Sequence, residues 1–245
     1  MKQNIYDNNE FFQQYKALRA RENNYNNLLE QPNFLTLVPA LKDKVVLDIG
    51  CGMGGFAAAC VNQGARHVTG IDISANMIAT AKSLHTYENL TFEQAAFEDL
   101  IVPTASIDFI SSSLAFHYIA DFSQLIKKIS VALRSDGILL FSIEHPIATS
   151  NKANEYSITD ETGNILHFAL DNYQNEGLRT QHWLVDNVMT YHRTMSTVLN
   201  TLIDNGLKIE KIIEPMPTDE AIAKLPSIQK ELRRPSFLIV RARKV

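Results

Sequence analysis

The sequence is poor in cysteine and contains no long apolar run. Its 245 residues include two cysteines, Cys51 and Cys60, which are more typical of small buried residues in a reducing cytosol than of a disulfide or a metal site. No apolar run is long enough to span a membrane, and the polar first residues do not resemble a signal peptide. We therefore expect a cytoplasmic protein with no membrane partner.

Basic residues are not in excess either. The chain has 23 Lys and Arg against 27 Asp and Glu, for a net charge of −4, which is opposite to the balance of proteins that bind nucleic acid by neutralising phosphates. We expect no nucleic-acid partner. No set of potential ligands has the spacing of a metal site, so we also expect no metal. With 45% apolar residues, the chain has enough apolar surface for one buried core.

Residues 45–56 are the part of the chain around which the rest is organised. The stretch begins with an apolar run broken only by Asp48, which is typical of a buried strand. Gly50, Gly52 and Gly54 follow at alternate positions, where glycine lets the backbone turn sharply and approach a ligand closely. An apolar helix comes next. This order predicts a nucleotide-type ligand at the carboxyl end of the strand.

A dinucleotide-binding fold is the first alternative, because Gly50, Gly52 and Gly55 also match the pattern Gly-x-Gly-x-x-Gly. Asp48 argues against it. A dinucleotide brings a pyrophosphate to this turn, which a carboxylate would repel, whereas a ligand with a cationic amino group would be attracted.

A second strand is predicted over residues 67–74, with an acid near its end. Asp72 lies 18 positions after Gly54, close to the spacing at which an acid binds ribose hydroxyls in nucleotide-binding folds. The alternative is that Asp72 caps the next helix. Ser74 is better placed for that cap, so we expect Asp72 to bind a ribose.

Three further sequence features follow the glycine turn. Asp-x-Gly-x-Gly-x-Gly at 48–54 is followed by Asp72, by Leu-x-x-His-Tyr at 114–118 and by Leu-Arg-x-x-Gly at 133–137. Together they resemble the class I, Rossmann-like S-adenosylmethionine-dependent methyltransferases of the type that acts on small molecules.

The resemblance is close over residues 40–145 and extends to 194–245 by the order of elements. It implies an α/β fold with a doubly wound, mostly parallel sheet of about seven strands. We expect a single domain over 1–245, with a helical cap at 1–39, a cofactor-binding core at 40–145, a substrate-lid insertion after the fifth strand at 146–190 and the rest of the sheet at 191–245.

The resemblance also implies the cofactor, S-adenosylmethionine, which leaves as S-adenosylhomocysteine. It assigns the aminocarboxypropyl end to Asp48 and the glycine turn, the ribose to Asp72, the adenine to the segment after the third strand and the methyl side to the turn after the fourth. The implied cofactor residues are Asp48, Gly50, Cys51, Gly52, Gly54, Asp72, Ile73, Met77, Ala96, Phe97, Glu98, Ser112, Leu114 and His117. Ala96 departs from the family, which commonly has an acid there.

The N-terminal segment has two interpretations. Tyr15 and Arg19 recur at helical spacing with apolar neighbours, which is typical of a packed helical extension. The family often covers the cofactor with an N-terminal helix, so the resemblance favours a lid with Tyr15 and Arg19 turned toward the cofactor.

Candidate catalytic residues lie where predicted strands end. His117 follows the fourth strand and could take a proton from the acceptor, or it could only shape the pocket. His145 follows the fifth strand with the same two alternatives. Tyr191 and His192, with Trp183 and Arg193 as substrate contacts, could form a pocket for a polar or anionic molecule; alternatively, Tyr191 and His192 merely end an edge strand.

The predicted function is methyl transfer from S-adenosylmethionine to an oxygen, nitrogen or carbon atom of a small molecule, mainly by proximity and with His117 as a possible base. A nicotinamide-dependent oxidoreductase, a methyltransferase acting on RNA or protein, and a non-catalytic protein that binds S-adenosylmethionine remain as alternatives. We expect a monomer or a homodimer.

Overall fold

A computed structural model describes residues 2–152 and 157–245. Met1 of the predicted cap and residues 153–156 of the predicted insertion lie outside the described residues. Seven strands form one sheet in the order β10-β11-β5-β4-β1-β2-β3. Their bounds are β1 Val45–Ile49, β2 His67–Asp72, β3 Leu90–Gln94, β4 Ile107–Ser113, β5 Leu133–Glu144, β10 Leu207–Ile213 and β11 Phe237–Lys244.

The sheet is mostly parallel. Strands β3, β2, β1, β4 and β5 run parallel, and β11 lies antiparallel between β5 and β10. This arrangement confirms the predicted α/β fold with a mostly parallel sheet of seven strands. In parallel sheets the carboxyl ends of the strands meet at one edge, so the ends of β1, β2, β4 and β5 lie together.

Helices cover both faces, as the pattern of buried strands requires. One apolar cluster joins the sheet to α5 (Phe122–Ala132) and α7 (Met195–Asp204). The other joins it to α2 (Gln31–Leu35), α3 (Gly55–Asn62) and α4 (Ala75–Leu84). Leu125 and Ile129 of α5 and Leu133 at the start of β5 are buried in the first cluster.

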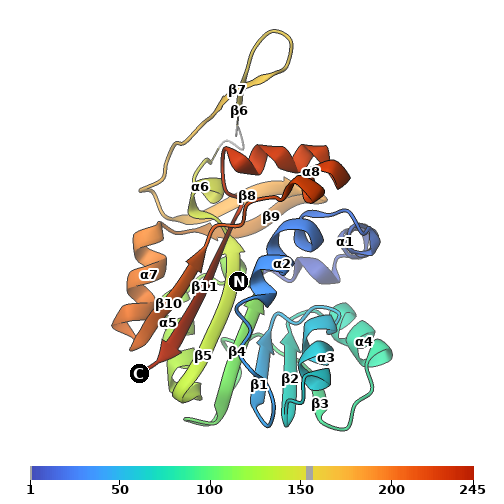
Figure 1. Ribbon diagram of the computed structural model, residues 1–245, viewed down its shortest axis with the longest axis vertical. Coiled ribbons are helices and arrows are strands. Elements are labelled where there is room, and N and C mark those ends of the chain that lie inside the picture. Colours follow the sequence, from blue (N-terminus) through green and yellow to red (C-terminus); the bar gives the residue numbers. More distant parts are fainter. Residues whose placement is uncertain (1, 153–156) are drawn as a thin grey trace.

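The N-terminal extension consists of η1 (Ile5–Asp7), α1 (Asn9–Ala20), the π-helical η2 (Asn26–Glu30) and α2. Figure 1 shows α1 and α2 at the end of the sheet where β1 and β4 terminate, on the same side as the β8–β9 hairpin. The predicted helices are thus present, and they lie over the carboxyl edge of the sheet.

The insertion after β5 contains more regular structure than its mixed composition indicated. It holds α6 (Pro146–Thr149), the hairpin of β6 (Ser157–Thr159) and β7 (Ile165–Phe168), and the hairpin of β8 (Gly177–Trp183) and β9 (Val185–His192). The β6–β7 hairpin projects away from the body, whereas β8–β9 lies across the end of the sheet (Figure 1). Beside it run α8 (Asp219–Lys224) and η4 (Pro226–Leu232). No helix within the described residues is long and apolar enough to cross a membrane.

Candidate functional site

The glycine turn after β1 is held against β2 by backbone hydrogen bonds. The amides of Gly50 and Cys51 donate to the Ile71 carbonyl oxygen over 2.8 and 2.9 Å. Gly50 has a φ of +70°, and a Cβ there would lie 2.5 Å from the Cβ of Ala115 in the loop after β4. Only glycine fits where the turn passes this loop, and the close approach brings the ends of β1 and β4 together.

Asp72, at the end of β2, also stabilises the glycine turn by hydrogen bonds. Its Oδ2 accepts the Gly52 amide at 3.0 Å, and its Oδ1 accepts the Ser74 amide at 2.9 Å. Burial raises the pKa of the Asp72 carboxyl. Because a carboxylate offers about four lone-pair sites, two remain for hydroxyl donors of a ligand. Ser74 accepts the Met77 amide and caps α4, as predicted.

Asp48 is a buried acid beneath the turn. Its side chain is 3% exposed, and the Ser111 hydroxyl donates to its Oδ1 over 2.8 Å. Burial raises the pKa of Asp48 to about 7, to which repulsion from Asp72 contributes. A ligand cation would restore the charged form, because an opposite charge lowers the pKa of an acid.

A cavity of about 1570 Å³ opens over these residues. Its floor is the carboxyl ends of the parallel strands, and its walls come from α1, η3 (Phe116–Tyr118) and the β8–β9 hairpin. Pockets for one small molecule usually measure about 300–1,000 Å³. The cavity therefore has room for two ligands side by side.

Most of the residues predicted for the site line this cavity. The cavity-lining residues are Tyr15, Arg19, Asp48, Gly50, Cys51, Gly52, Asp72, Ile73, Met77, Ala96, Phe97, Glu98, Leu114, His117, Trp183 and Tyr191. The predicted residues that the structure places away from it are Gly54, Ser112, His145, His192 and Arg193.

Gly54 and Ser112 face the protein interior. A Cβ on Gly54 would lie 2.4 Å from the ring of Phe92, so this glycine lets α3 pack against β3. The Ser112 hydroxyl donates to the Ile49 carbonyl oxygen over 2.8 Å and is fully buried. Ser112 thus joins β4 to β1, while the next residue, Ser113, lines the cavity.

Both of the other predicted histidines are engaged in structural contacts. His145 Nδ1 accepts the Ile147 amide at the start of α6, and its Nε2 lies 2.8 Å from Glu214 Oε1. His192 is fully buried between the Thr149 hydroxyl and the Tyr173 carbonyl oxygen, each 2.8 Å from a ring nitrogen. Burial lowers the pKa of both imidazoles. The structure does not bring them together with His117 at the cavity.

Arg193 secures the hairpin instead of facing the cavity. Its guanidinium lies 5.1 Å from the centre of the Phe122 ring and 5.8 Å from that of Tyr191. It also donates to the carbonyl oxygens of Ile119 and Ala120. These contacts fix β9 against the loop after η3. Tyr191 ends β9 next to His192, as the edge-strand alternative predicted, and it also lines the cavity.

His117 lines the cavity as an uncharged ring. The Glu144 amide donates to its Nδ1 over 3.4 Å, which leaves the proton of the neutral imidazole on Nε2. Burial lowers the pKa of His117 to about 3, and repulsion from Arg193 adds to this. At neutral pH such an imidazole is a weak proton acceptor, so the geometry favours its alternative as a shaping residue.

The segment predicted to contact adenine follows β3. The carbonyl oxygens of Ala96 and Phe97 already accept the amides of Asp99 and Leu100, and Lys128 donates to Phe97 O over 3.1 Å. The Glu98 carboxylate is partly exposed. It is therefore the acceptor in this segment that is better placed to receive a ligand amino group in place of the acid missing at Ala96.

The N-terminal residues tie the two sides of the cavity together. Asp7 accepts the Ser74 hydroxyl over 2.5 Å and the amides of Ala75 and Asn76 at the start of α4. Gln3 Oε1 accepts a hydrogen bond from the Met189 amide in β9 over 2.8 Å. Residues 3–7 thus connect the core to the hairpin, and the Tyr6 side chain in this segment lines the cavity.

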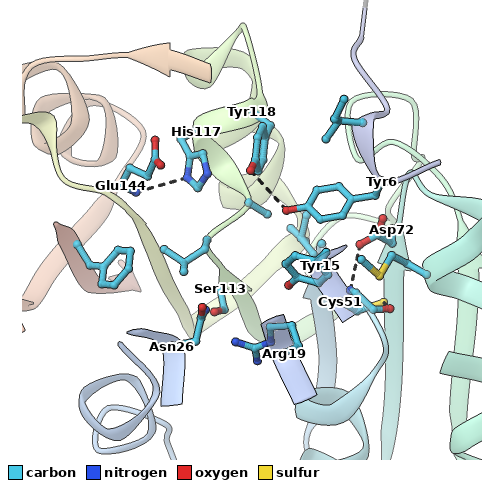
Figure 2. Close-up of a pocket in the computed structure, with 18 of the residues that line it drawn as sticks. Tyr6, Tyr15, Arg19, Asn26, Cys51, Asp72, Ser113, His117, Tyr118 and Glu144 are labelled. Carbon is cyan, nitrogen blue, oxygen red and sulfur yellow. Dashed lines mark hydrogen bonds between the residues drawn. The ribbon is translucent and has the colours of Figure 1, made fainter. Parts of the chain in front are cut away.

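Arg19 and the aromatic residues of this cap point inward. Arg19 Nη1 is buried with no hydrogen-bond partner among the described residues, which indicates a site for an anionic ligand group. Figure 2 shows Arg19 near Ser113 and Asn26, and Tyr6 facing Tyr118, with the two hydroxyls 3.4 Å apart.

The cavity also holds residues that were not among the predicted site residues, including Tyr6, Asn26, Ser113, Tyr118 and Glu144. For two of these the sequence contained a signal. Glu144, at the end of β5, and Tyr118, in η3 after β4, each adjoin a histidine that was predicted for the site. Tyr6 and Asn26 had no sequence signal, because only tertiary packing of the cap brings them here.

Within residues 2–152 and 157–245, no group of three or more His, Cys, Asp and Glu side chains is gathered as metal ligands would be. The two cysteines are free thiols.

Comparison with known proteins gives consistent results. A family described as methyltransferase domain matches residues 47–141. A crystal structure of an S-adenosylmethionine-dependent methyltransferase from Mesorhizobium loti is 37% identical, with a TM-score of 0.82, covering 88% of this chain and 97% of that one. A Listeria monocytogenes protein described as a candidate enzyme of the same kind is 41% identical, with a TM-score of 0.83, covering 88% and 96%. A Haemophilus influenzae protein described as uncharacterised is 36% identical over 98% of this chain and 97% of its own.

Proposed function

The chain belongs to the S-adenosylmethionine-dependent methyltransferases, and from this premise we propose that it methylates an oxygen, nitrogen or carbon atom of a small molecule held beside the cofactor in the same cavity. The observation that carries the proposal is the cavity itself. It measures about 1570 Å³, and the N-terminal residues and the β8–β9 hairpin lie over it.

The residues around the glycine turn fit S-adenosylmethionine, which supplies a methyl group on a positively charged sulfur when it is bound. Asp72 has two lone-pair sites left for the ribose hydroxyls. Asp48 would attract the amino group, and the unpaired Arg19 Nη1 would bind the carboxylate. Gly50 and Gly52 present backbone without side chains to the same ligand.

The main role of the protein in the reaction would be to hold the acceptor atom in line with the methyl group. A sulfonium methyl is already a reactive electrophile, and alignment of two reactants can supply several kcal/mol of the barrier reduction. His117 would contribute by shaping the methyl side, because its low pKa makes it a poor base.

The remaining features of the proposal follow from the same architecture. Residues 1–245 would act as one domain, with 1–39 and 146–190 closing the cavity over the core. We keep cytoplasmic location and a monomer or homodimer as predictions. An acceptor on RNA or protein is the alternative, and the net charge of −4 does not favour RNA.

Transfer of a labelled methyl group tests the acceptor class. The purified protein is incubated with S-adenosylmethionine carrying a labelled methyl and, in separate reactions, with the small-molecule, protein and RNA fractions of a bacterial extract. We expect enzyme-dependent label in the small-molecule fraction only. Label confined to protein or RNA would contradict the proposal, and binding of cofactor without any transfer would favour a non-catalytic protein.

The affinity for S-adenosylhomocysteine should rise with pH between about 6 and 8. Asp48 has its pKa raised to about 7 by burial, and the ammonium of the ligand binds the deprotonated carboxylate better than the acid. Affinity is therefore gained as pH rises through this pKa and then levels off. Calorimetric titration at several pH values measures it, and Asp48→Asn should remove the slope; a flat profile for the unchanged protein would contradict the role of Asp48.

A further inference from the structure

Glu144, the last residue of β5, occupies the acceptor side of the cavity. Its backbone amide binds His117, and the Gln181 side chain from β8 hydrogen-bonds its carboxylate. Figure 2 shows Glu144 beside His117, on the far side of Tyr118 and Tyr6 from Asp72. The residue is thus separated from the proposed ribose site and lies next to the turn that would flank the methyl group.

One oxygen of this carboxylate is left without a protein partner. Glu144 Oε2 is shielded from solvent and has no hydrogen-bond partner among the described residues. A buried carboxylate oxygen without a hydrogen bond is destabilising, and it needs either its own proton or a donor from a ligand. Burial raises the pKa of Glu144 to about 7, against the opposing effects of Gln181 and of the positive charge of Arg234. The group can therefore gain or lose a proton near neutral pH.

Aromatic rings line the same cavity as Glu144, and the Tyr118 ring lies near enough for the Glu144 charge to act on it. Tyr6 lies between Tyr15, 5.1 Å away between ring centres, and Tyr118, 6.1 Å away. Trp183 packs 6.2 Å from Tyr15, and all four residues line the cavity. Faces of aromatic rings attract cations. A cavity that contains both an acid and aromatic rings is suited to a positively charged ligand.

Resting on the proposed function, we infer that the methyl acceptor is a small amine, and that Glu144 is the carboxylate that binds its ammonium group and takes its proton. The ammonium first transfers one proton to the Glu144 carboxylate and becomes a neutral amine with a free electron pair. That pair forms the new carbon–nitrogen bond while the carbon–sulfur bond breaks and its electrons stay on sulfur. The product leaves as a methylammonium ion, and Glu144 returns its proton to solvent.

The groups that face Glu144 are consistent with this assignment. His117 remains neutral because of its low pKa, and burial raises the pKa of Tyr118, so neither titrates near neutral pH. The positive charge of Arg234 lowers the pKa of Glu144 and so opposes the effect of burial.

The charge of the labelled product tests whether the methyl acceptor is an amine. The labelled small-molecule product from the extract reaction is separated from the donor by chromatography and passed over a cation-exchange resin at mildly acidic pH. A methylated amine is retained, whereas an ether, ester or carbon-methylated neutral product flows through. Label in the flow-through would overturn the amine and leave the proposed function standing, while label in no small molecule would overturn the proposed function itself.

Glu144→Gln separates the role of the carboxylate from its shape. The amide preserves the size of the side chain and one acceptor oxygen for Gln181, but it cannot take a proton. We expect S-adenosylhomocysteine affinity to remain unchanged, kcat to fall by at least about 100-fold, as for loss of a general base, and the rise of kcat with pH through about 7 to disappear. The matched control is Glu220→Gln, an exposed glutamate on α8, which should behave as the unchanged protein. A Glu144→Gln protein with full kcat or an unchanged pH profile would overturn the assignment.

Discussion

Replacing Asp72 with asparagine should weaken S-adenosylhomocysteine binding by roughly 10- to 100-fold. Each carboxylate oxygen of Asp72 accepts one backbone amide, from Gly52 or Ser74, and the lone pairs that remain would accept the ribose hydroxyls. Hydrogen bonds to a charged group contribute about 1.5–3 kcal/mol, which corresponds to this change in dissociation constant. Calorimetric titration measures the affinity directly.

The control for this prediction is Asp204→Asn, because Asp204 is an exposed acid at the end of α7. It should bind S-adenosylhomocysteine as the unchanged protein does. Urea unfolding of the Asp72→Asn protein shows whether the turn still folds, since an amide cannot accept both backbone bonds. A folded Asp72→Asn protein with unchanged affinity would rule out Asp72 as the ribose residue.

Gly50→Ala should lower the free energy of unfolding by roughly 2–5 kcal/mol and reduce cofactor binding. The backbone of Gly50 is left-handed, with a φ of +70°, which costs other residues about 1–2 kcal/mol. The added Cβ would also lie 2.5 Å from that of Ala115, and overpacking costs about 1–3 kcal/mol. Relief of this contact has to move the loop that carries His117, so the cavity changes shape as well.

Gly163→Ala is a matched control for the contact. Gly163 has a similar φ of +86° but no atom within 4 Å of an added Cβ. Its substitution should therefore cost only the free energy of a left-handed backbone, at most about 1–2 kcal/mol. Urea unfolding of both variants gives the comparison. Equal stabilities for the two proteins would mean that the approach of the glycine turn to Ala115 is not required.

The parts of the fold that sequence reasoning anticipated are those set by local chemistry. The apolar run before Gly50 is typical of a buried strand, and Ser74 could cap α4 because its neighbours already formed a helical pattern. Both are present. The turn glycines and Asp72 are likewise close in sequence to the elements that position them.

The missed features depend on which way a side chain points. Three consecutive serines end β4, and Ser111 binds Asp48, Ser112 binds the β1 backbone and Ser113 reaches the cavity. The sequence alone does not show which of the three faces a ligand, because that depends on the pairing of β4 with its neighbours. The same applies to Glu144, which lines the cavity, and the adjacent His145, which binds Glu214.

The insertion was unpredictable for another reason. Its hairpins carry exposed side chains such as Ile158 and Leu166, so neither face has the strict alternation by which a half-buried strand is recognised. Its packing on the cap, through the contact of Trp183 with Phe11 at 5.3 Å, is a long-range interaction that no local pattern shows.

The most direct test of the central claim is calorimetric titration of the purified protein with S-adenosylhomocysteine and, separately, with NADH. The arrangement of Asp48, Asp72 and the glycine turn predicts micromolar binding of S-adenosylhomocysteine at one site per chain and no binding of NADH, because Asp48 repels a pyrophosphate at this turn. Binding of NADH alone would contradict the account and require the cavity to be interpreted as that of an oxidoreductase.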